Sequence, residues 1–162
     1  MGQYWLPVNL DKKEFVDPHK LGTGLKLWEQ LASRPGTGAA LLILCAAMPE
    51  PRGGGDFDLD ANWHGVERTA SAPGPTPGPM PEAYQAIARR TIGRWAGNRI
   101  ALVGDYAEDS DLAPEHHAKS IYDRCRAGEY ADVTSDVARV IEHELQGEYS
   151  GEGWREWTRK SV

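Results

Sequence analysis

The hydrophobic and polar positions of this chain change from short strand patterns to longer helical ones. At the N-terminus, the pattern fits a strand over residues 3–8 and a returning strand over Glu14–Val16, with the polar turn Asn9–Lys13 between them. Proline has no N–H to donate to a strand ladder, so Pro7 predicts that the first strand lies at a sheet edge or at a bulge. The start of the chain therefore predicts an antiparallel hairpin.

Two helices are predicted next, each after a Gly-Thr-Gly sequence. In the first helix Thr23 is the expected N-cap, and apolar residues recur with helical spacing at Leu25, Trp28, Leu31 and Ala32. The second helix, capped by Thr37, covers the apolar run Ala39–Met48, which is also short enough for a buried strand. Its scarcity of β-branched residues favours a buried helix with Cys45 in the core. Helix capping explains both Gly-Thr-Gly sequences better than phosphate binding, because neither continues into a nucleotide-binding fingerprint.

Residues 49–92 differ from the rest of the chain in composition. Five prolines alternate with small residues between positions 73 and 81, which is the composition of an extended linker. A short helix over Pro81–Arg90 then leads back to the main body. Each flanking piece is too small to bury its own core, so we interpret 49–92 as a Gly/Pro-rich insertion in a single domain covering 1–162.

An apolar run at Ile100–Val103 follows a Gly-Asn turn and predicts the central strand of the sheet. On this strand Leu102 is expected to be buried in one apolar cluster with Trp28. The run stops at Gly104 and opens into a loop, residues 105–111, that holds three aspartates and one glutamate. We call this segment the acidic loop.

Two helices and a short strand complete the pattern. Asp111 is the expected cap of a helix that runs to about Arg126 and ends at Gly128. A short strand over Tyr130–Val133 precedes a last helix, capped by Ser135, with an apolar stripe at Val137, Ile141 and Leu145. This order of elements predicts an α+β fold, a single domain with a small, mostly antiparallel sheet and about four helices packed against it.

The acidic loop is the strongest candidate for chemistry. Carboxylates at a strand end suit a hard cation such as Mg²⁺ or Mn²⁺, and the candidate ligands are Asp105, Asp109 and Asp111. With a metal bound, hydrolysis of a phosphoester would follow, with Asp105, Asp109 and His116 as candidate catalytic residues. The alternative interpretation is a solvated loop whose aspartates cap turns and the next helix.

A second acidic segment, Asp56–Glu67, resembles a calcium-binding loop in the spacing of its oxygen-bearing residues. Ala61 replaces the glycine that the sharp turn of such a loop requires, so coincidence is the favoured interpretation. No complete catalytic motif is present elsewhere in the sequence.

Charge and composition narrow the class of protein. The chain of 162 residues has 24 acidic and 18 basic residues and a net charge of −6, which argues against nucleic acid as a partner. Its two cysteines form no disulfide framework. The longest apolar run is about half of a membrane span, and the first residues lack the pattern of a secretory signal. We therefore expect a cytoplasmic protein without a membrane partner.

Several segments together resemble one family of small proteins. They are Met1–Trp5, Asn9–Glu14, Gly24–Leu27, Arg52–Asp56, Trp95–Gly97 and Val103–Ala107. The family comprises uncharacterised proteins encoded by bacteria and their phages, and its most specific parts are the opening Met-Gly-Gln-Tyr and the Val-Gly-Asp-Tyr strand end. The resemblance covers most of the chain outside the insertion. It implies a cytosolic, phage-linked protein and supplies no catalytic residue.

Two classes of function remain after the sequence alone. The first is a small binding or protein-interaction module, with another protein as partner and with the acidic face, the tryptophans and the Pro-rich segment as recognition surfaces. The second is a divalent-metal-dependent hydrolase that acts on a phosphoester at the acidic loop. Because no complete catalytic constellation can be written, the sequence favours the interaction module.

Overall fold

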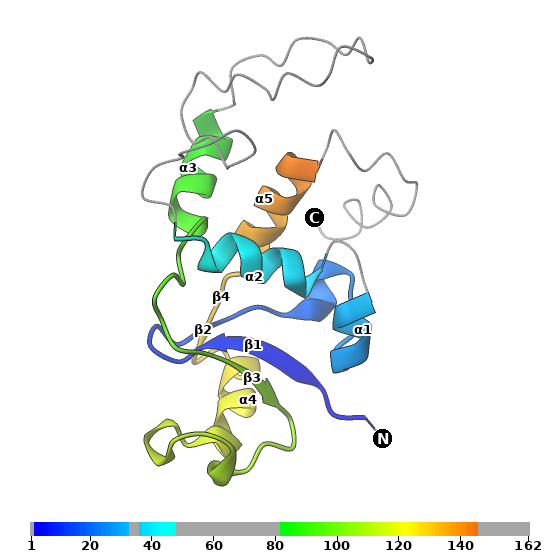
Figure 1. Ribbon diagram of the computed structural model, residues 1–162, viewed down its shortest axis with the longest axis vertical. Helices are drawn as coiled ribbons and strands as arrows, with labels where there is room; N and C mark the ends of the chain where they lie inside the picture. Colours follow the sequence, from blue (N-terminus) through cyan, green and yellow to red (C-terminus); the bar gives the residue numbers. More distant parts are fainter. Residues whose placement is uncertain (1, 33–35, 48–81, 146–162) are drawn as a thin grey trace.

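The hairpin at the N-terminus forms the centre of the sheet. The computed structural model describes residues 2–32, 36–47 and 82–145. Its strands are β1 (Trp5–Asn9), β2 (Glu14–Phe15), β3 (Ile100–Gly104) and β4 (Ala131–Asp132), in the sheet order β3-β1-β2-β4 (Figure 1). β1 pairs antiparallel with both β2 and β3, and β4 pairs parallel with β2. The predicted α+β fold with a mostly antiparallel sheet is therefore confirmed.

Five α-helices and three 3₁₀-helices surround this sheet in the described ranges. The α-helices are α1 (Leu27–Ala32), α2 (Thr37–Cys45), α3 (Glu82–Thr91), α4 (Ala118–Arg126) and α5 (Thr134–Leu145). The 3₁₀-helices are η1 (Pro18–Leu21), η2 (Asp109–Asp111) and η3 (Pro114–His116). None of the described helices combines the length and the apolar character that crossing a membrane requires.

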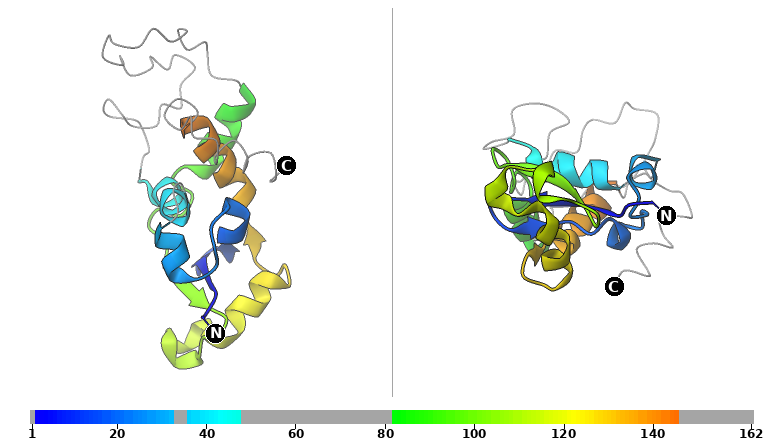
Figure 2. Two further views of the ribbon diagram at one scale, coloured as in Figure 1. Left: turned by 90° about the vertical axis from the view of Figure 1, so that its right-hand side faces the viewer. Right: turned by 90° about the horizontal axis from the view of Figure 1, so that it is seen from below.

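Two hydrophobic cores lie on opposite faces of the sheet, because successive strand residues point to opposite sides. The first core joins Val16 of the hairpin to α2, α3 and α5, with Trp95 fully buried at its centre. The second joins Leu6 and Val8 of β1 to α4, through Ile121 and other residues. The sheet therefore lies between two layers of helices, with α4 on one face and α2, α3 and α5 on the other (Figures 1 and 2).

β1 is an interior strand, so the edge position predicted from Pro7 is wrong. The carbonyl of Pro7 accepts a hydrogen bond from the N–H of Val16 at 3.0 Å, so the position of its missing N–H also faces β2. β2 ends one residue earlier, at Phe15. The proline therefore removes a single bond at the end of a short ladder and leaves the longer ladder with β3 complete.

The predicted helix ends are only partly correct. α2 is a helix, as its composition predicts, but its N-cap is Gly36 and not Thr37. Thr23 caps no helix, because its hydroxyl donates to the carbonyl of Pro18. The helix expected from Asp111 begins only at Ala118, after η2, η3 and a left-handed His117 with φ 50°. Gly128 does end α4, with φ 78°.

Three residues that the sequence assigned to the core are exposed. Trp28 is 78% exposed on α1, and the buried side of that helix is polar, since Gln30 donates to the carbonyls of Trp5 and Leu25. Leu102 is 41% exposed because β3 is an edge strand and not the central one. Cys45 is an exposed free cysteine on the outer side of α2. The predicted cluster of Leu102 with Trp28 is therefore wrong.

The range interpreted as an insertion, 49–92, lies partly inside the described structure. Its last part forms α3, the short helix that the sequence predicts, and this helix places Tyr84 and Ala88 in the first core against α5. Residues 49–81, including the calcium-loop-like segment Asp56–Glu67, lie outside the described residues, as does the C-terminal segment 146–162.

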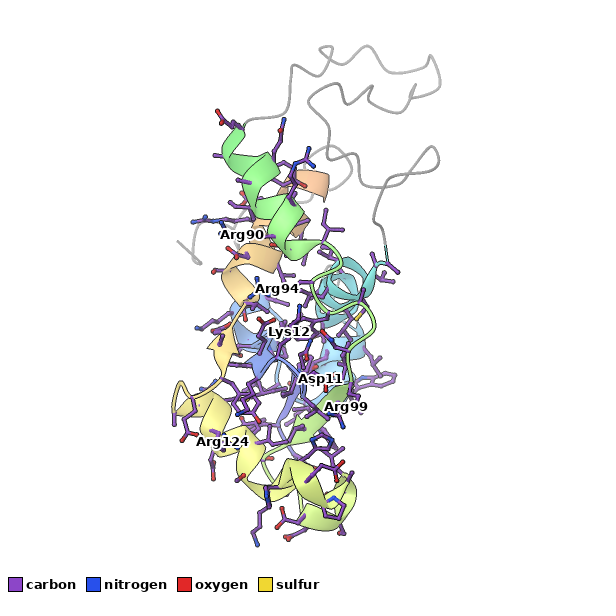
Figure 3. All side chains as sticks on the ribbon, turned by 90° about the vertical axis from the view of Figure 1, so that its left-hand side faces the viewer. Asp11, Lys12, Arg90, Arg94, Arg99 and Arg124 are labelled. Atoms are coloured by element: carbon purple, nitrogen blue, oxygen red, sulfur yellow. The ribbon has the colours of Figure 1, made fainter. Side chains whose placement is uncertain are left out.

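A buried carboxylate fastens the hairpin to the segment that leads into β3. Glu14 accepts hydrogen bonds from Arg94 Nε at 2.8 Å, Arg94 Nη2 at 2.6 Å and Trp95 Nε1 at 2.8 Å. Lys12 Nζ donates to the carbonyl of Arg94 at 2.5 Å, and Figure 3 shows these two side chains close together. Burial raises the pKa of Glu14, but the hydrogen bonds from Arg94 and Trp95 outweigh it and hold that pKa below its ordinary value.

The same segment is also attached to the end of α2 through its backbone. The N–H groups of Gly93 and Trp95 donate to the carbonyls of Ile43 and Leu44 at 2.9 and 2.7 Å. Gly93 has φ 72°, and a Cβ there would lie 2.6 Å from the carbonyl oxygen of Ala46. Only glycine fits this approach, so residues 93–95 join the sheet to the helix layer at a single point.

Arg94→Met is expected to lower the free energy of unfolding by about 2–3 kcal/mol, because it leaves the buried Glu14 carboxylate with Trp95 as its remaining side-chain donor. The matched control is Arg90→Met, which breaks the more exposed pair of Arg90 with Asp136. That pair is screened by water, and the loss is expected to be much smaller. Urea denaturation of both variants measures the difference, and equal losses would contradict the role assigned to Glu14.

The free energy of unfolding is expected to fall as the pH is lowered below 4.5, the ordinary pKa of a glutamate such as Glu14. The folded state depresses this pKa, so the stabilisation is complete above 4.5 and is lost as the pH falls through the folded value. Asp132 and Asp136, whose pKa values are also lowered, contribute in the same direction. Glu14→Gln should reduce the slope of stability against pH in acid, and an unchanged slope would contradict this assignment.

Candidate functional site

The acidic loop begins at the point where β3 leaves the sheet, and its first carboxylate holds the two strands together there. The N–H of Tyr4 donates to Asp105 Oδ1 at 2.9 Å, and the N–H of Asp105 donates to the carbonyl of Tyr4 at 3.0 Å. The side chain and the backbone of Asp105 thus extend the β1–β3 ladder by one step.

The other carboxylates of the acidic loop also bind backbone N–H groups. Asp109 Oδ1 accepts from the N–H of Lys119 at 3.1 Å, in the first turn of α4. Asp111 and Glu108 form a reciprocal capping box across η2, in which Asp111 Oδ2 accepts from the N–H of Glu108 at 2.9 Å. Asp109 therefore binds at a helix end and Asp111 at a turn, while Asp105 extends the strand ladder.

His116, the candidate general base, faces a cation and not the loop carboxylates. Its Nε2 lies 3.2 Å from Arg99 Nη1. A guanidinium offers only donors, so Nε2 is the acceptor in this contact. Arg99 also binds Asp11, at 2.8 Å from Nε and 2.7 Å from Nη2. The backbone and side-chain hydrogen bonds from Arg99 lower the pKa of Asp11, and Figure 3 shows these two residues together.

The structure thus separates the residues that the metal hypothesis requires to converge. Within residues 2–32, 36–47 and 82–145, no three side chains of His, Cys, Asp or Glu are placed to hold a metal ion. Asp105, Asp109, Asp111 and His116 each bind a different partner. The metal-dependent hydrolase stays a prediction, and the arrangement of the loop follows the alternative in which aspartates cap turns and the next helix.

A cleft of about 550 Å³ lies where the parallel pair β2–β4 meets η1 and α4. Its charged groups are already paired, since Lys20 Nζ binds Asp132 at 2.6 Å and Arg126 Nη1 binds Asp17 at 2.9 Å. Burial raises the pKa of the Cys125 thiol in its wall to about 12, which keeps that sulfur protonated and a poor nucleophile. The cleft therefore offers neither an unpaired charge nor a reactive thiol.

The third candidate is the side of the molecule formed by α1, α2 and the outer edge of β3, which we call the α1–α2–β3 side. The left view of Figure 2 places these three elements on one side of the molecule, with β4 on the other. It carries most of the exposed large apolar residues, namely Trp28, Leu31, Leu42 and Leu102.

α2 is uncharged and apolar over its whole circumference, although only one face of it is buried. Ala40, Ile43 and Leu44 point into the first core. The outer face is an exposed stripe of Gly38, Leu42 and Cys45 at i, i+4 and i+7. Leu42 is 75% exposed. An apolar outer face on a helix of this kind is typical of a contact surface, since helices that are apolar all round are normally enclosed.

β3 presents an open edge beside this helix. The β1–β3 register and its flanking hydrogen bonds show which backbone groups face β1. The N–H and C=O of Ala101 and Val103 point toward β1, and those of Leu102 point away from it. No other strand in the described structure pairs with this edge. Because Ile100 packs against the first core, Leu102 two residues later lies on the same face of the sheet as α2. The segment Ile100–Gly104 has no proline, charge or bulge to protect it.

Sequence reasoning missed this surface, although one of its signals was present. The even apolarity of α2, TGAALLILC, predicts complete burial, whereas the structure leaves its outer face exposed. A polar outer stripe would mark the exposed face of a helix. Without one, the sequence cannot distinguish a helix buried in the core from a helix whose outer face is covered by a binding partner. The edge position of β3 has no local signal, because strand order depends on pairing with distant residues.

Comparison of the chain with known protein families, with curated proteins and with solved structures gives no match.

Asp105→Asn is expected to cost about 1 kcal/mol or less in unfolding free energy, because the amide oxygen still accepts from Tyr4. We expect calorimetric titration of Mg²⁺ or Mn²⁺ into the wild type to give no saturable heat, since the loop carboxylates are engaged with backbone N–H groups. Saturable heat in the wild type that Asp105→Asn removes would instead establish a metal site at the acidic loop.

Proposed function

We propose that the protein is a small protein-interaction module and that its α1–α2–β3 side is the binding surface. The observation that carries this proposal is the outer face of α2, an uncharged helix that presents Leu42 to solvent beside the open edge of β3. We further propose that it acts in the cytoplasm, in the bacterial or phage setting that the sequence resemblance implies.

The energy for such binding comes from two sources on this surface. Burial of an exposed side chain such as Trp28, Leu31 or Leu42 contributes about 1.5–3 kcal/mol each. The N–H and C=O groups of Leu102, which face away from β1, add directional hydrogen bonds to any strand laid against them. The apolar groups supply affinity, and the strand edge sets the orientation of the partner.

The chemistry of the surface also selects the class of partner. α2 and β3 contain no charged residue, so a phosphate or another strongly charged group would gain little there. The net charge of −6 opposes binding along a nucleic acid backbone. An apolar protein surface with an extended segment at its rim matches both parts of the α1–α2–β3 side.

Site-specific photocrosslinking in the producing cell tests the proposal. A photoreactive residue at Leu42 is expected to give a discrete crosslinked protein band, because that side chain lies in the proposed contact. The same residue at the exposed Ser110, on η2, is the matched control. Adding Leu102→Lys should abolish the band by placing a charge on the strand edge.

Equal labelling from Leu42 and Ser110 would contradict the proposal. A band at Leu42 that persists in the presence of Leu102→Lys would restrict the contact to the helix and exclude the strand edge.

A further inference from the structure

We infer that the partner is a second copy of this chain, and that two β3 strands pair antiparallel about Leu102 to form one continuous sheet. This inference rests on the proposed function, because it names the occupant of the same α1–α2–β3 side. It is carried by three properties of that side: the shape of the strand edge, the charges at its two ends and the position of α2.

The strand edge is self-complementary about its middle residue. β3 has five residues, and Leu102 is the third of them. A two-fold axis through Leu102 overlaps the whole strand with its copy, and it is the residues facing outward, Ile100, Leu102 and Gly104, that meet across the axis. The two Leu102 residues then exchange both backbone hydrogen bonds at the centre of the strand pair.

The charged residues at the two ends of the strand are complementary under the same two-fold rotation. Residues equally distant from Leu102 become directly opposite, so Arg99 of each copy faces Asp105 of the other. Both side chains lie on the same face of the sheet, because their positions differ by an even number. Opposite charges in this position stabilise a strand pair, and the symmetry produces the pair twice.

Both side chains keep hydrogen-bonding capacity beyond their contacts in the single copy, since each terminal nitrogen of Arg99 carries two N–H groups. Asp105 uses Oδ1 to accept from Tyr4, and its Oδ2 makes no hydrogen bond within the described residues. The Arg99 side chain is 61% exposed while it binds Asp11. The central residues of the strand carry no charge, so no like charges are brought together near the axis.

The same axis brings the exposed helices together. Antiparallel pairing in one sheet requires a two-fold axis perpendicular to the sheet, which leaves α2 of both copies on the same face. α2 lies on the β3 side of the molecule in both views of Figure 2, so the two helices approach each other across the axis. Gly38 and Cys45 flank Leu42 with small side chains, which permits the helix axes to come within about 8–10 Å.

The exposed apolar residues of this side supply about half of the area that a standard dimer interface uses. The exposed parts of Trp28, Leu31, Leu42 and Leu102 sum to roughly 400–500 Å² per copy, at the upper range of patches on monomers. With the strand backbone and the residues around it, the contact approaches the ~800 Å² per partner of a standard interface. One symmetric contact therefore accounts for both an open strand edge and an exposed apolar helix.

The test is the mass of the full chain in solution, measured by sedimentation equilibrium over a concentration series. The wild type is expected at twice 17.8 kDa. Leu102→Lys and Leu42→Glu should shift the mass to that of one chain, while Ser110→Lys on η2 should leave the dimer intact. Circular dichroism of each variant verifies that the fold is retained.

A charge exchange tests the register itself. Arg99→Asp alone and Asp105→Lys alone each place like charges opposite one another, and each should weaken the homodimer about tenfold or more. Mixing the two variants places opposite charges at both ends of the strand pair. A heterodimer with near wild-type affinity is therefore expected, an outcome that a merely structural role of either residue would not produce.

A wild-type chain that stays at the mass of one copy would overturn the inference, as would a dimer that survives Leu102→Lys or gains nothing from the mixed variants. If the chain is a single copy while Leu42 still crosslinks to a different protein, the proposed interaction module stands and only self-association fails. If both the dimer and the crosslink are absent, the proposed function fails as well.

Discussion

The Glu14 carboxylate is the constraint on which the rest of the structure depends. It lies in a two-residue strand, accepts from Arg94 and Trp95, and so links the hairpin to the segment that leads into β3. Trp95 in turn fills the first core. The position of β3 along β1 follows from where this segment is held, since only four residues separate Trp95 from Ile100.

This link decides which strand edge is left open. The segment after α3 passes the end of α2 and delivers β3 to the side of β1 opposite β2. The helix layer therefore covers the face of the sheet while the outer edge of β3 stays open beside α2. The residues that hold β3 against β1 therefore also leave its outer edge exposed. The same arrangement stabilises the fold and forms the candidate contact.

Sequence reasoning succeeded where a pattern is local. The hairpin, the helical nature of α2, the short α3 and the end of α4 at Gly128 all depend on neighbouring residues, and each was predicted. Burial was predicted less well, because the inward side of α1 is set by Gln30, whose hydrogen bonds to Trp5 and Leu25 no periodicity reveals. In the acidic loop, the sequence identified the carboxylates but not their backbone partners, which come from Tyr4 and Lys119.

The long separation between β1 and β3 has a consequence for the order in which the chain folds. The pairs Trp5–Gly104 and Asn9–Ile100 join residues more than ninety positions apart, whereas the hairpin closes over a few residues. Local pairing is fast and distant pairing is slow, because a long loop must close first. During synthesis β1 therefore has one free edge until Gly104 has left the ribosome, and the open edge passes from β1 to β3 only when this distant pairing forms.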